Sequence, residues 1–212
     1  MAERAHRSPA TPRPVVPLSE VEEGSPAQRE RRRRILEATL ALATKGGFDA
    51  VQMRAVAERA GVALGTLYRY FPSKVHLLVA GLAHELSRVL ERIERAPVPG
   101  ATAAERVLLV LHRNTVALQR DPHLTEAMTR AFMFADTSVA EEVRQVSRLT
   151  ERMLTHAMGV EEASDEDKDI ARVIGDVWLS NLVAWVTRRA SAEDVENRLA
   201  LTVRLLLSAR DR

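Results

Sequence analysis

The chain has 212 residues and a mass of 23.6 kDa. This length is sufficient to bury a sizeable apolar core, so the fold needs no disulfide bond or structural metal ion. The sequence contains no cysteine, which excludes thiol chemistry and a disulfide framework and is consistent with a reducing cytoplasm. Hydrophobic residues make up 46%, and no apolar run approaches the length that spans a bilayer. The arginines at the start are not followed by the apolar segment of a secretory signal, so we expect a cytoplasmic protein that contacts no membrane.

The charge is distributed unevenly along the chain. Between Pro26 and Leu78, ten Lys or Arg residues stand against four Asp or Glu residues, a balance of +6. Between Glu91 and Arg212, seventeen basic residues stand against twenty acidic ones, a balance of −3. Because a basic segment attracts polyanions, the N-terminal part is predicted to bind nucleic acid.

Residues 1–24 are rich in proline and lack a periodic apolar pattern, so we expect a disordered tail there. From residue 25 onward, helical spacing of apolar residues and helix-cap signatures predict an all-α chain of nine helices. The expected starts are Ser25, Met53, Ala63, Ser73, Thr102, Asp121, Ser138, Ser164 and Ser191, and the expected stops include Gly46-Gly47, Gly61 and the prolines after Ala96.

The two short helices around Gly61 are predicted to form a helix-turn-helix, whose second helix lies in the major groove of DNA. In that helix Leu67 and Phe71 are four residues apart and are expected to face the core. The side chains expected on the outward side of this helix are of types that can contact DNA. Gly65 permits close approach of the backbone, Thr66 can touch a base edge, and tyrosine hydroxyls can donate to phosphates. Taken alone, however, the cluster of Tyr68, Tyr70 and Phe71 is equally typical of plain core.

The runs GFDAVQMRAVAERAGV (47–62) and GTLYRYFPSK (65–74) resemble the DNA-binding signature of the TetR family of bacterial transcription regulators. The resemblance implies a helix-turn-helix domain over residues 25–72, a helical ligand-binding and dimerisation domain over residues 73–210, and double-stranded operator DNA as a partner. The resemblance also implies which residues contact DNA, namely Gln52, Arg54, Thr66, Tyr68, Tyr70 and Lys74. Gly65 and Arg69, which can face outward, complete the predicted set of DNA contacts. The family commonly has Ser or Thr where Gln52 and Ala63 stand.

A basic run, Arg29 and Arg31 to Arg34, precedes or opens the first helix. Such a run is usually a solvated helix face, and the alternative is an arm that enters the minor groove. Either arrangement would strengthen DNA binding at low salt.

The helix expected from about Ser164 to Arg189 is apolar around most of its circumference, with its main stripe running from Ile170 to Trp185. Such a helix must be covered on more than one side, by a ligand cavity or by a second subunit. The last helix, with Val195, Leu199, Thr202 and Leu206 at helical spacing, is its expected neighbour. TetR-like proteins form homodimers through two such helices, and a dimer supplies the two DNA-reading units that a palindromic operator requires.

Methionine and phenylalanine gather between residues 128 and 158. Such a cluster is more often plain core, but in a sensor it can line an adaptable apolar pocket. Asn181 lies within an apolar stripe and is predicted to bind ligand or to hydrogen-bond across a dimer. The candidate ligand-binding residues are Leu111, Met128, Phe132, Met133, Phe134, Met153, Trp178, Asn181, Leu182 and Trp185.

A narrower resemblance appears in LTEAMTRA (124–131), IARVI (170–174), DVWLSNL (176–182) and TRRAS (187–191). These runs are similar to a group within the TetR family that represses cholesterol catabolism in actinobacteria. The resemblance implies that a lipid effector, a sterol-derived acyl-CoA thioester, releases the repressor from DNA. Arg130, Arg188 and Arg189 are candidates for binding the CoA phosphates.

No catalytic, metal or cofactor site is predicted. The histidines lack metal-ligand spacing, and the sequence has neither a glycine-rich phosphate loop nor a nucleophile elbow. The remaining alternatives are a TetR-like regulator of a different lipid or drug, and an architectural DNA-binding protein that senses no ligand.

Overall fold

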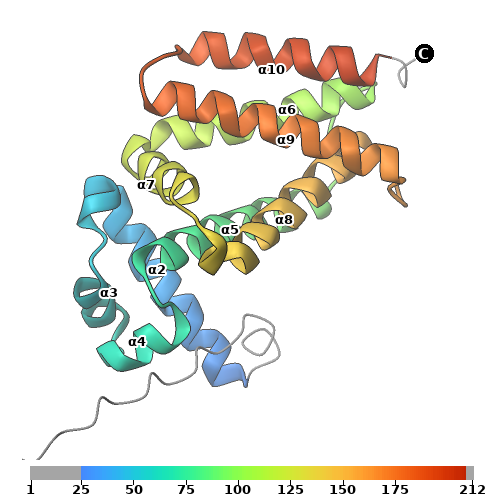
Figure 1. Cartoon of the computed structure of the whole chain (residues 1–212). Helices are drawn as coiled ribbons and strands as arrows, with labels where there is room; N and C mark the ends of the chain where they lie inside the picture. Colours follow the sequence, from blue (N-terminus) through green and yellow to red (C-terminus); the bar gives the residue numbers. More distant parts are fainter. Residues whose placement is uncertain (1–24, 209–212) are drawn as a thin grey trace, which may run out of the picture.

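The computed structural model describes residues 25–208, so the expectation of a disordered tail and the end of the predicted second domain lie outside the described residues. Within that range the chain forms nine α-helices and a short 3₁₀ helix, with no strand (Figure 1). The predicted all-α, nine-helix architecture is confirmed. In chain order the elements are α2 (Pro26–Ala50), α3 (Met53–Ala60), α4 (Leu64–Tyr70), α5 (Lys74–Glu94), α6 (Ala103–Arg120), α7 (Pro122–Met133), η1 (Thr137–Val139), α8 (Ala140–Met158), α9 (Asp165–Val186) and α10 (Ala192–Leu207).

Most helices begin at the residues whose side chains were expected to cap them. Ser25 and Gln28 form the predicted capping box, and Ser164 and Ser191 form similar boxes with Asp167 and Asp194. These side chains accept hydrogen bonds from first-turn N–H groups that have no partner within the helix. The sequence therefore places these helix starts correctly.

The predicted start of α8 at Ser138 is wrong. Asp136, two residues earlier, accepts the backbone N–H of Ser138 at 2.8 Å and opens the η1 turn. The regular helix begins only at Ala140, after Val139, whose side chain makes no capping bond. The tighter 3₁₀ turn therefore occupies the residues that were expected to form the first turn of α8.

The C-terminal end of α2 is broken at a pair of glycines. Gly46 and Gly47 have non-helical backbone angles, and Gly47 has a φ of +67°, which favours glycine. The residues from Phe48 to Ala50 form a separate short turn that leads into α3. The predicted stop at Gly46-Gly47 is thus confirmed as a break in the helix.

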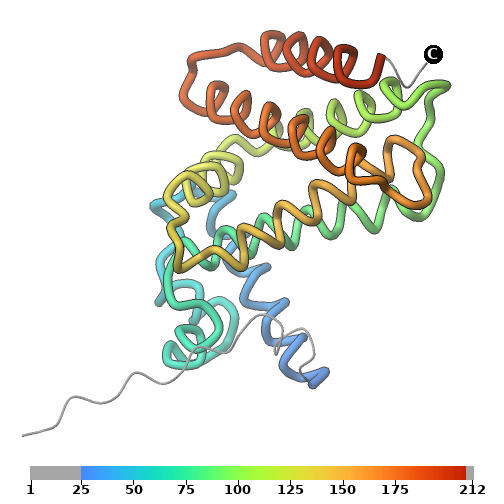
Figure 2. The backbone as a smooth tube through the Cα atoms, turned by 45° about the vertical axis from the view of Figure 1, so that its right-hand side comes forward, coloured from blue at the N-terminus to red at the C-terminus, as the bar shows by residue number. Residues whose placement is uncertain are grey.

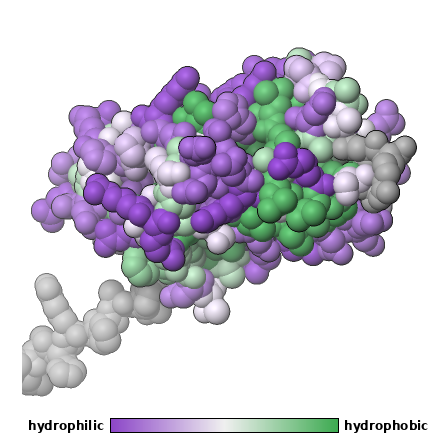
Figure 3. Space-filling view, turned by 90° about the horizontal axis from the view of Figure 1, so that it is seen from above, coloured by the Kyte–Doolittle hydropathy of each residue, from purple (hydrophilic) through white to green (hydrophobic). Residues whose placement is uncertain are grey.

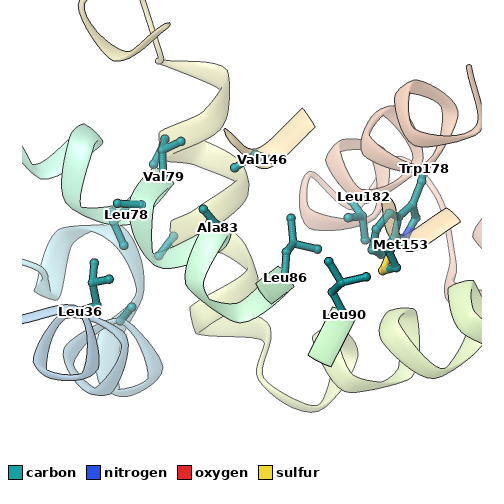
Figure 4. Packing of buried hydrophobic residues seen from close by; sticks show 14 of the residues in the cluster. Leu36, Leu78, Val79, Ala83, Leu86, Leu90, Val146, Met153, Trp178 and Leu182 are labelled. Atoms are coloured by element: carbon teal, nitrogen blue, oxygen red, sulfur yellow. The ribbon is translucent and has the colours of Figure 1, made fainter. Parts of the chain in front are cut away.

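The helices are arranged so that α3 and α4 lie at one end of the molecule and α9 and α10 at the other (Figure 1). Between them, α5 packs against α2, α7 and α8 and so connects the two ends (Figure 2). Buried side chains continue without interruption from Leu36 and Leu78, past Leu86, to Trp178 and Leu182 (Figure 4). No helix in the described part of the chain is long and apolar enough to cross a membrane.

Candidate DNA-reading surface and ligand cavity

The helix-turn-helix is formed by α3 and α4. Gly61 ends α3 in the left-handed conformation with a φ of +64°, and its N–H donates to the carbonyl groups of the preceding turn. Leu67 and Phe71 are completely buried, as their spacing predicts. This burial fixes which side of α4 faces outward.

Most of the predicted DNA-contacting side chains lie on that outward side. Gln52, Arg54, Gly65, Tyr68 and Arg69 are exposed, and Thr66 is half-buried. At Gly65 an added Cβ would find no heavy atom within 4 Å, so the fold itself does not require a glycine there. The surface has the donors, the positive charge and the close backbone access that DNA recognition needs.

Tyr70 and Lys74 are arranged differently from the prediction. Tyr70 is only 7% exposed and its ring packs 6.4 Å from that of Phe71, so it contributes mainly to the core. The Lys74 ammonium donates to the Phe48 carbonyl at 3.2 Å and lies 3.9 Å from the centre of the Phe48 ring. The two residues therefore hold the helix-turn-helix domain together, because their polar or aromatic groups find partners inside the chain.

Two arginines of the basic run at the start of α2, Arg32 and Arg33, also make contacts within the chain. Arg33 forms ion pairs with Glu30 and Glu37, and these carboxylates hold the pKa of the Arg33 guanidinium above its usual range. The Arg32 guanidinium lies 5.6 Å from the centre of the Phe71 ring. These contacts favour the interpretation of the run as a charged helix face.

A cavity of about 390 Å³ lies among α5, α6, α7, α8 and α9, within the size range of small-molecule sites. Most of its wall is apolar. Its lining residues are Leu82, Glu85, Leu86, Val89, Asn114, Ala117, Leu118, Asp121, Leu124, Thr125, Met128, Thr129, Phe132, Val146, Ser147, Thr150, Glu151, Ala171, Arg172, Gly175, Asp176, Trp178, Leu179 and Leu182. Four of the predicted ligand-binding residues are therefore brought together here: Met128, Phe132, Trp178 and Leu182.

Three other predicted ligand-binding residues are buried elsewhere. Leu111 and Met153 belong to the closed core. Asn181 is 5% exposed, and its amide donates to the Val177 carbonyl of its own helix at 2.8 Å. None of the three lines the cavity. The prediction included them because helical spacing identifies buried positions but does not show whether a buried position faces packed side chains or a cavity.

The remaining three lie near the surface. Met133 and Phe134 stand at the end of α7, where they are 58% and 62% exposed. Trp185 lines a separate open hollow at the turn between α9 and α10, together with Arg188 and Arg189. The structure therefore does not bring these three side chains together with Met128.

Several cavity residues were not predicted. Thr125 and Thr129 share one face of α7 with Met128 and Phe132, at the spacing i, i+3, i+4 and i+7. Leu82, Glu85, Leu86 and Val89 repeat this spacing on α5. The helical period could have added the threonines, but nothing in the sequence indicates that α5 faces a hollow. Asn114 of α6 also lines the cavity, and its amide donates to the Val110 carbonyl at 2.9 Å.

The charged residues of the cavity are mostly acidic. Glu85, Asp121, Glu151 and Asp176 line it, and Arg172 is the basic residue of the lining. The Arg172 guanidinium lies 3.9 Å from the Glu151 carboxylate and 2.6 Å from that of Asp169. The predicted phosphate-binding arginines are elsewhere: Arg130 pairs with Asp49 and Glu126, and Arg188 and Arg189 lie at the α9–α10 turn.

Two family models match the chain. Residues 35–80 match the model "Bacterial regulatory proteins, tetR family", and residues 100–206 match "Tetracyclin repressor-like, C-terminal domain". Over 190 residues the chain is 63% identical to the HTH-type transcriptional repressor KstR of Rhodococcus jostii, a match that covers 90% of this chain and 89% of that protein. The chain belongs to the TetR family. It is therefore a transcriptional regulator and not an enzyme.

Solved structures of TetR regulators share this fold. A TetR transcriptional regulator from Rhodococcus sp. RHA1 is 35% identical, with a TM-score of 0.79 over 85% of this chain and 97% of that one. FadR of Thermus thermophilus, described in complex with lauroyl-CoA, is 22% identical, with a TM-score of 0.64 over 83% of this chain and 93% of that one. At this identity, the second likeness concerns the fold alone.

This TetR-family chain leaves an apolar face uncovered on α9 and α10. Val173, Leu201 and Leu205 are 46%, 52% and 69% exposed, and Figure 3 shows apolar surface gathered at this end of the molecule. The buried stripe of α10 is Val195, Leu199, Val203 and Leu207, whereas Thr202 and Leu206, predicted to share the inner stripe, are half-buried. The stripe shifts by one residue because α10 turns its inner side toward α6 as well as α9.

Proposed function

We propose that this protein is a TetR-type repressor that binds palindromic operators as a homodimer and is released by a sterol-derived acyl-CoA thioester, so that it controls genes of steroid catabolism. The observation that carries the proposal is the largely apolar cavity of about 390 Å³ in a chain 63% identical to a KstR repressor. A transcriptional regulator acts where the chromosome lies, so we place it in the cytoplasm.

The uncovered face of α9 and α10 supports the homodimer. Exposed leucines such as Leu201 and Leu205 lose contact with water when a second copy covers them. A two-fold dimer repeats the α3–α4 surface, and the two surfaces must be about 34 Å apart to enter successive major grooves on one side of the DNA.

The apolar wall supports a lipid effector. Met128, Phe132 and Trp178 offer the adaptable and aromatic surface that a steroid nucleus requires. The lauroyl-CoA complex described for T. thermophilus FadR illustrates that the fold can hold an acyl-CoA. Because carboxylates dominate the charged lining, the CoA phosphates would remain outside the cavity, where the positive charge of Arg172 is the cation that its lining offers.

The acidic lining also favours a second candidate effector. Glu85, Asp121, Glu151 and Asp176 would suit an apolar drug that carries a positive charge, which would make the protein a regulator of a drug response. A non-sensing architectural role is less well supported, because it gives no reason for a cavity of ligand size.

The release mechanism that we favour is a population shift between two arrangements of the helices. Leu82, Leu86 and Val89 of α5 line the cavity, and the same helix begins at Lys74, directly after the DNA-reading helix. A ligand that spreads the cavity walls would swing α5 and change the separation of the two DNA-reading units. A coupling of roughly 1–3 kcal/mol suffices for induction.

A fluorescence-anisotropy titration on the DNA upstream of the protein's own gene tests the proposal. The additions compared are the CoA thioester of a cholestenoic acid, palmitoyl-CoA, cholesterol and an apolar cationic drug. We expect release by the steroid thioester alone. Equal release by cholesterol would refute the thioester assignment, and release by the drug alone would favour the second candidate.

A further inference from the structure

Two carboxylates, one that caps α7 and one within it, connect the cavity to the end of α2. We name this pair of contacts, Asp121 with Thr44 and Glu126 with Phe48, the α7 latch. The contacts lie on either side of the Gly46-Gly47 break, one before it and one after it. The latch joins parts of the chain that are more than seventy residues apart in sequence.

The first contact belongs to a residue that also lines the cavity. One Asp121 carboxylate oxygen accepts the Leu124 N–H at 2.9 Å and so caps α7, and the other accepts the Thr44 hydroxyl at 2.6 Å. Asp121 is itself part of the cavity wall. A change of cavity shape that moves the start of α7 therefore acts directly on the last regular turn of α2.

The second contact fixes the segment after the break. The Glu126 carboxylate accepts the Phe48 N–H at 2.9 Å, and the same oxygen lies 2.7 Å from where a Cβ on Gly47 would stand. Arg130, one turn further along α7, places its guanidinium 4.5 Å from the centre of the Phe48 ring and pairs with Asp49. Lys74 donates a hydrogen bond to the Phe48 carbonyl at 3.2 Å. Phe48 is thus held through its N–H, its carbonyl and its ring.

From this arrangement we propose that Asp121 and Glu126 are positioning residues through which occupancy of the cavity is transmitted to the helix-turn-helix. The inference rests on the proposed function, since it takes the cavity as the effector site. Thr125, Met128 and Thr129 of α7 line the cavity, while Glu126 and Arg130 contact the Phe48 segment. A ligand that rotates or shifts α7 moves Phe48, and α3 begins only five residues later, at Met53.

The glycine break lets the end of α2 move separately from the rest of that helix. Gly46 and Gly47 have non-helical backbone angles, so the segment after them can turn relative to α2 at small cost. The latch supplies the hydrogen bonds by which α7 holds the chain on both sides of the break. Loss of the latch should therefore uncouple DNA affinity from cavity occupancy.

The test fills the cavity without using any effector. Because the chain has no cysteine, Ser147→Cys introduces a single thiol in the cavity lining, and Thr150→Cys is a second position. Each variant is treated with methyl or dodecyl methanethiosulfonate. The position carried forward is the one whose dodecyl adduct changes the tryptophan emission of a Trp185→Phe protein, in which Trp178 of the cavity wall is the remaining tryptophan.

The chosen cysteine substitution is then made in three backgrounds. The first carries Thr44→Val and Glu126→Ala, the second carries Thr44→Val alone, and the third carries Thr137→Val as the matched control. Thr44 and Thr137 are both exposed, so Thr44→Val is not expected to impair folding, which circular dichroism verifies. Operator affinity is measured by anisotropy for the methyl and dodecyl adducts of each protein.

We expect the dodecyl adduct to weaken operator binding on the order of tenfold in the control, and less than about twofold when the latch is removed. Thr44→Val alone should give an intermediate ratio. An equal loss in all proteins would overturn the latch and leave the proposed function intact. No loss in any of them, with the cavity filled, would overturn both.

Discussion

The indole N–H of Trp178 donates a hydrogen bond to the Thr115 hydroxyl at 3.2 Å, which joins α9 to α6 beside the cavity. Both residues are buried, with Thr115 1% and Trp178 7% exposed. The bond fixes the orientation of the Trp178 ring, which forms part of the cavity wall, because burying an indole N–H without a hydrogen-bond partner costs free energy. The shape of the cavity therefore depends on a residue that does not itself line it.

Thr115→Val should destabilise the protein by about 1–3 kcal/mol, since valine has nearly the same shape but leaves the Trp178 N–H without an acceptor. Urea unfolding measures the loss, and tryptophan emission reports the freed ring. Thr137→Val, at an exposed site, is the control. Equal stability of the two variants would mean that the bond contributes nothing.

Gly65→Ala should weaken operator binding about tenfold, which corresponds to ~1.4 kcal/mol, while the protein stays folded. The added methyl group meets no atom of the protein within 4 Å, and alanine is the better helix former. Loss of affinity would therefore arise from contact with DNA. Anisotropy and thermal unfolding are measured in parallel, and unchanged affinity would exclude a close approach of DNA at this position.

Tyr68 and Tyr70 should behave in opposite ways. Tyr68 is 45% exposed, so Tyr68→Phe should cost about tenfold in operator affinity, roughly 1.5 kcal/mol for a hydrogen bond to phosphate, with little change in stability. Tyr70 is buried, so Tyr70→Ala should lower the free energy of unfolding by about 3 kcal/mol, as for other large-to-small core changes. The reverse pattern in anisotropy and urea unfolding would contradict the assignment.

Leu205→Glu should convert the proposed homodimer to a monomer, because it places a charge on the apolar face of α10. Sedimentation velocity measures the mass, and operator affinity should fall with it since a monomer has one DNA-reading unit. Ala96→Glu, an exposed position after α5, is the control and should leave the mass unchanged. A Leu205→Glu protein that remains dimeric would place the interface elsewhere.

His84 should make stability depend on pH near neutrality. Burial lowers the pKa of His84 below its ordinary value of 6.5, and Arg88 and Arg32 lower it further. As the pH falls below 6.5, the unfolded chain takes up this proton more readily than the folded protein, so stability present at higher pH is lost. The free energy of unfolding should decrease from pH 7.5 to 5.5.

His84→Gln should reduce this slope, and urea unfolding at both pH values measures it. Asp136 and Asp194 also have lowered pKa values, held down by hydrogen bonds from Ser138 and Ser191, but ordinary aspartate titrates far below this window. An identical slope in wild type and variant would exclude His84 as the source.

Local signals in the sequence were sufficient for most of the helices and for the buried side of α4. Ser25, Ser164 and Ser191 cap their helices as expected, and Leu67 and Phe71 face inward, because both effects depend on residues only a few positions apart. The start of α8 was missed where two local signals competed, since Asp136 opened a 3₁₀ turn before Ser138 could cap a helix.

The position of the cavity depends on long-range contacts, which the helical periodicity of the sequence does not encode. Met128 and Met153 are both buried apolar residues in the predicted cluster, yet only Met128 lines the hollow. Whether a buried position meets a neighbouring side chain or a void is decided by how five helices pack, and so is the pairing of Asp121 with Thr44 across 77 positions.

By itself the sequence determined the family, the all-α fold and the outward face of α4, because these follow from short-range patterns. Only the tertiary structure decided where the cavity lies and how α7 connects it to α2, because both arise from long-range packing.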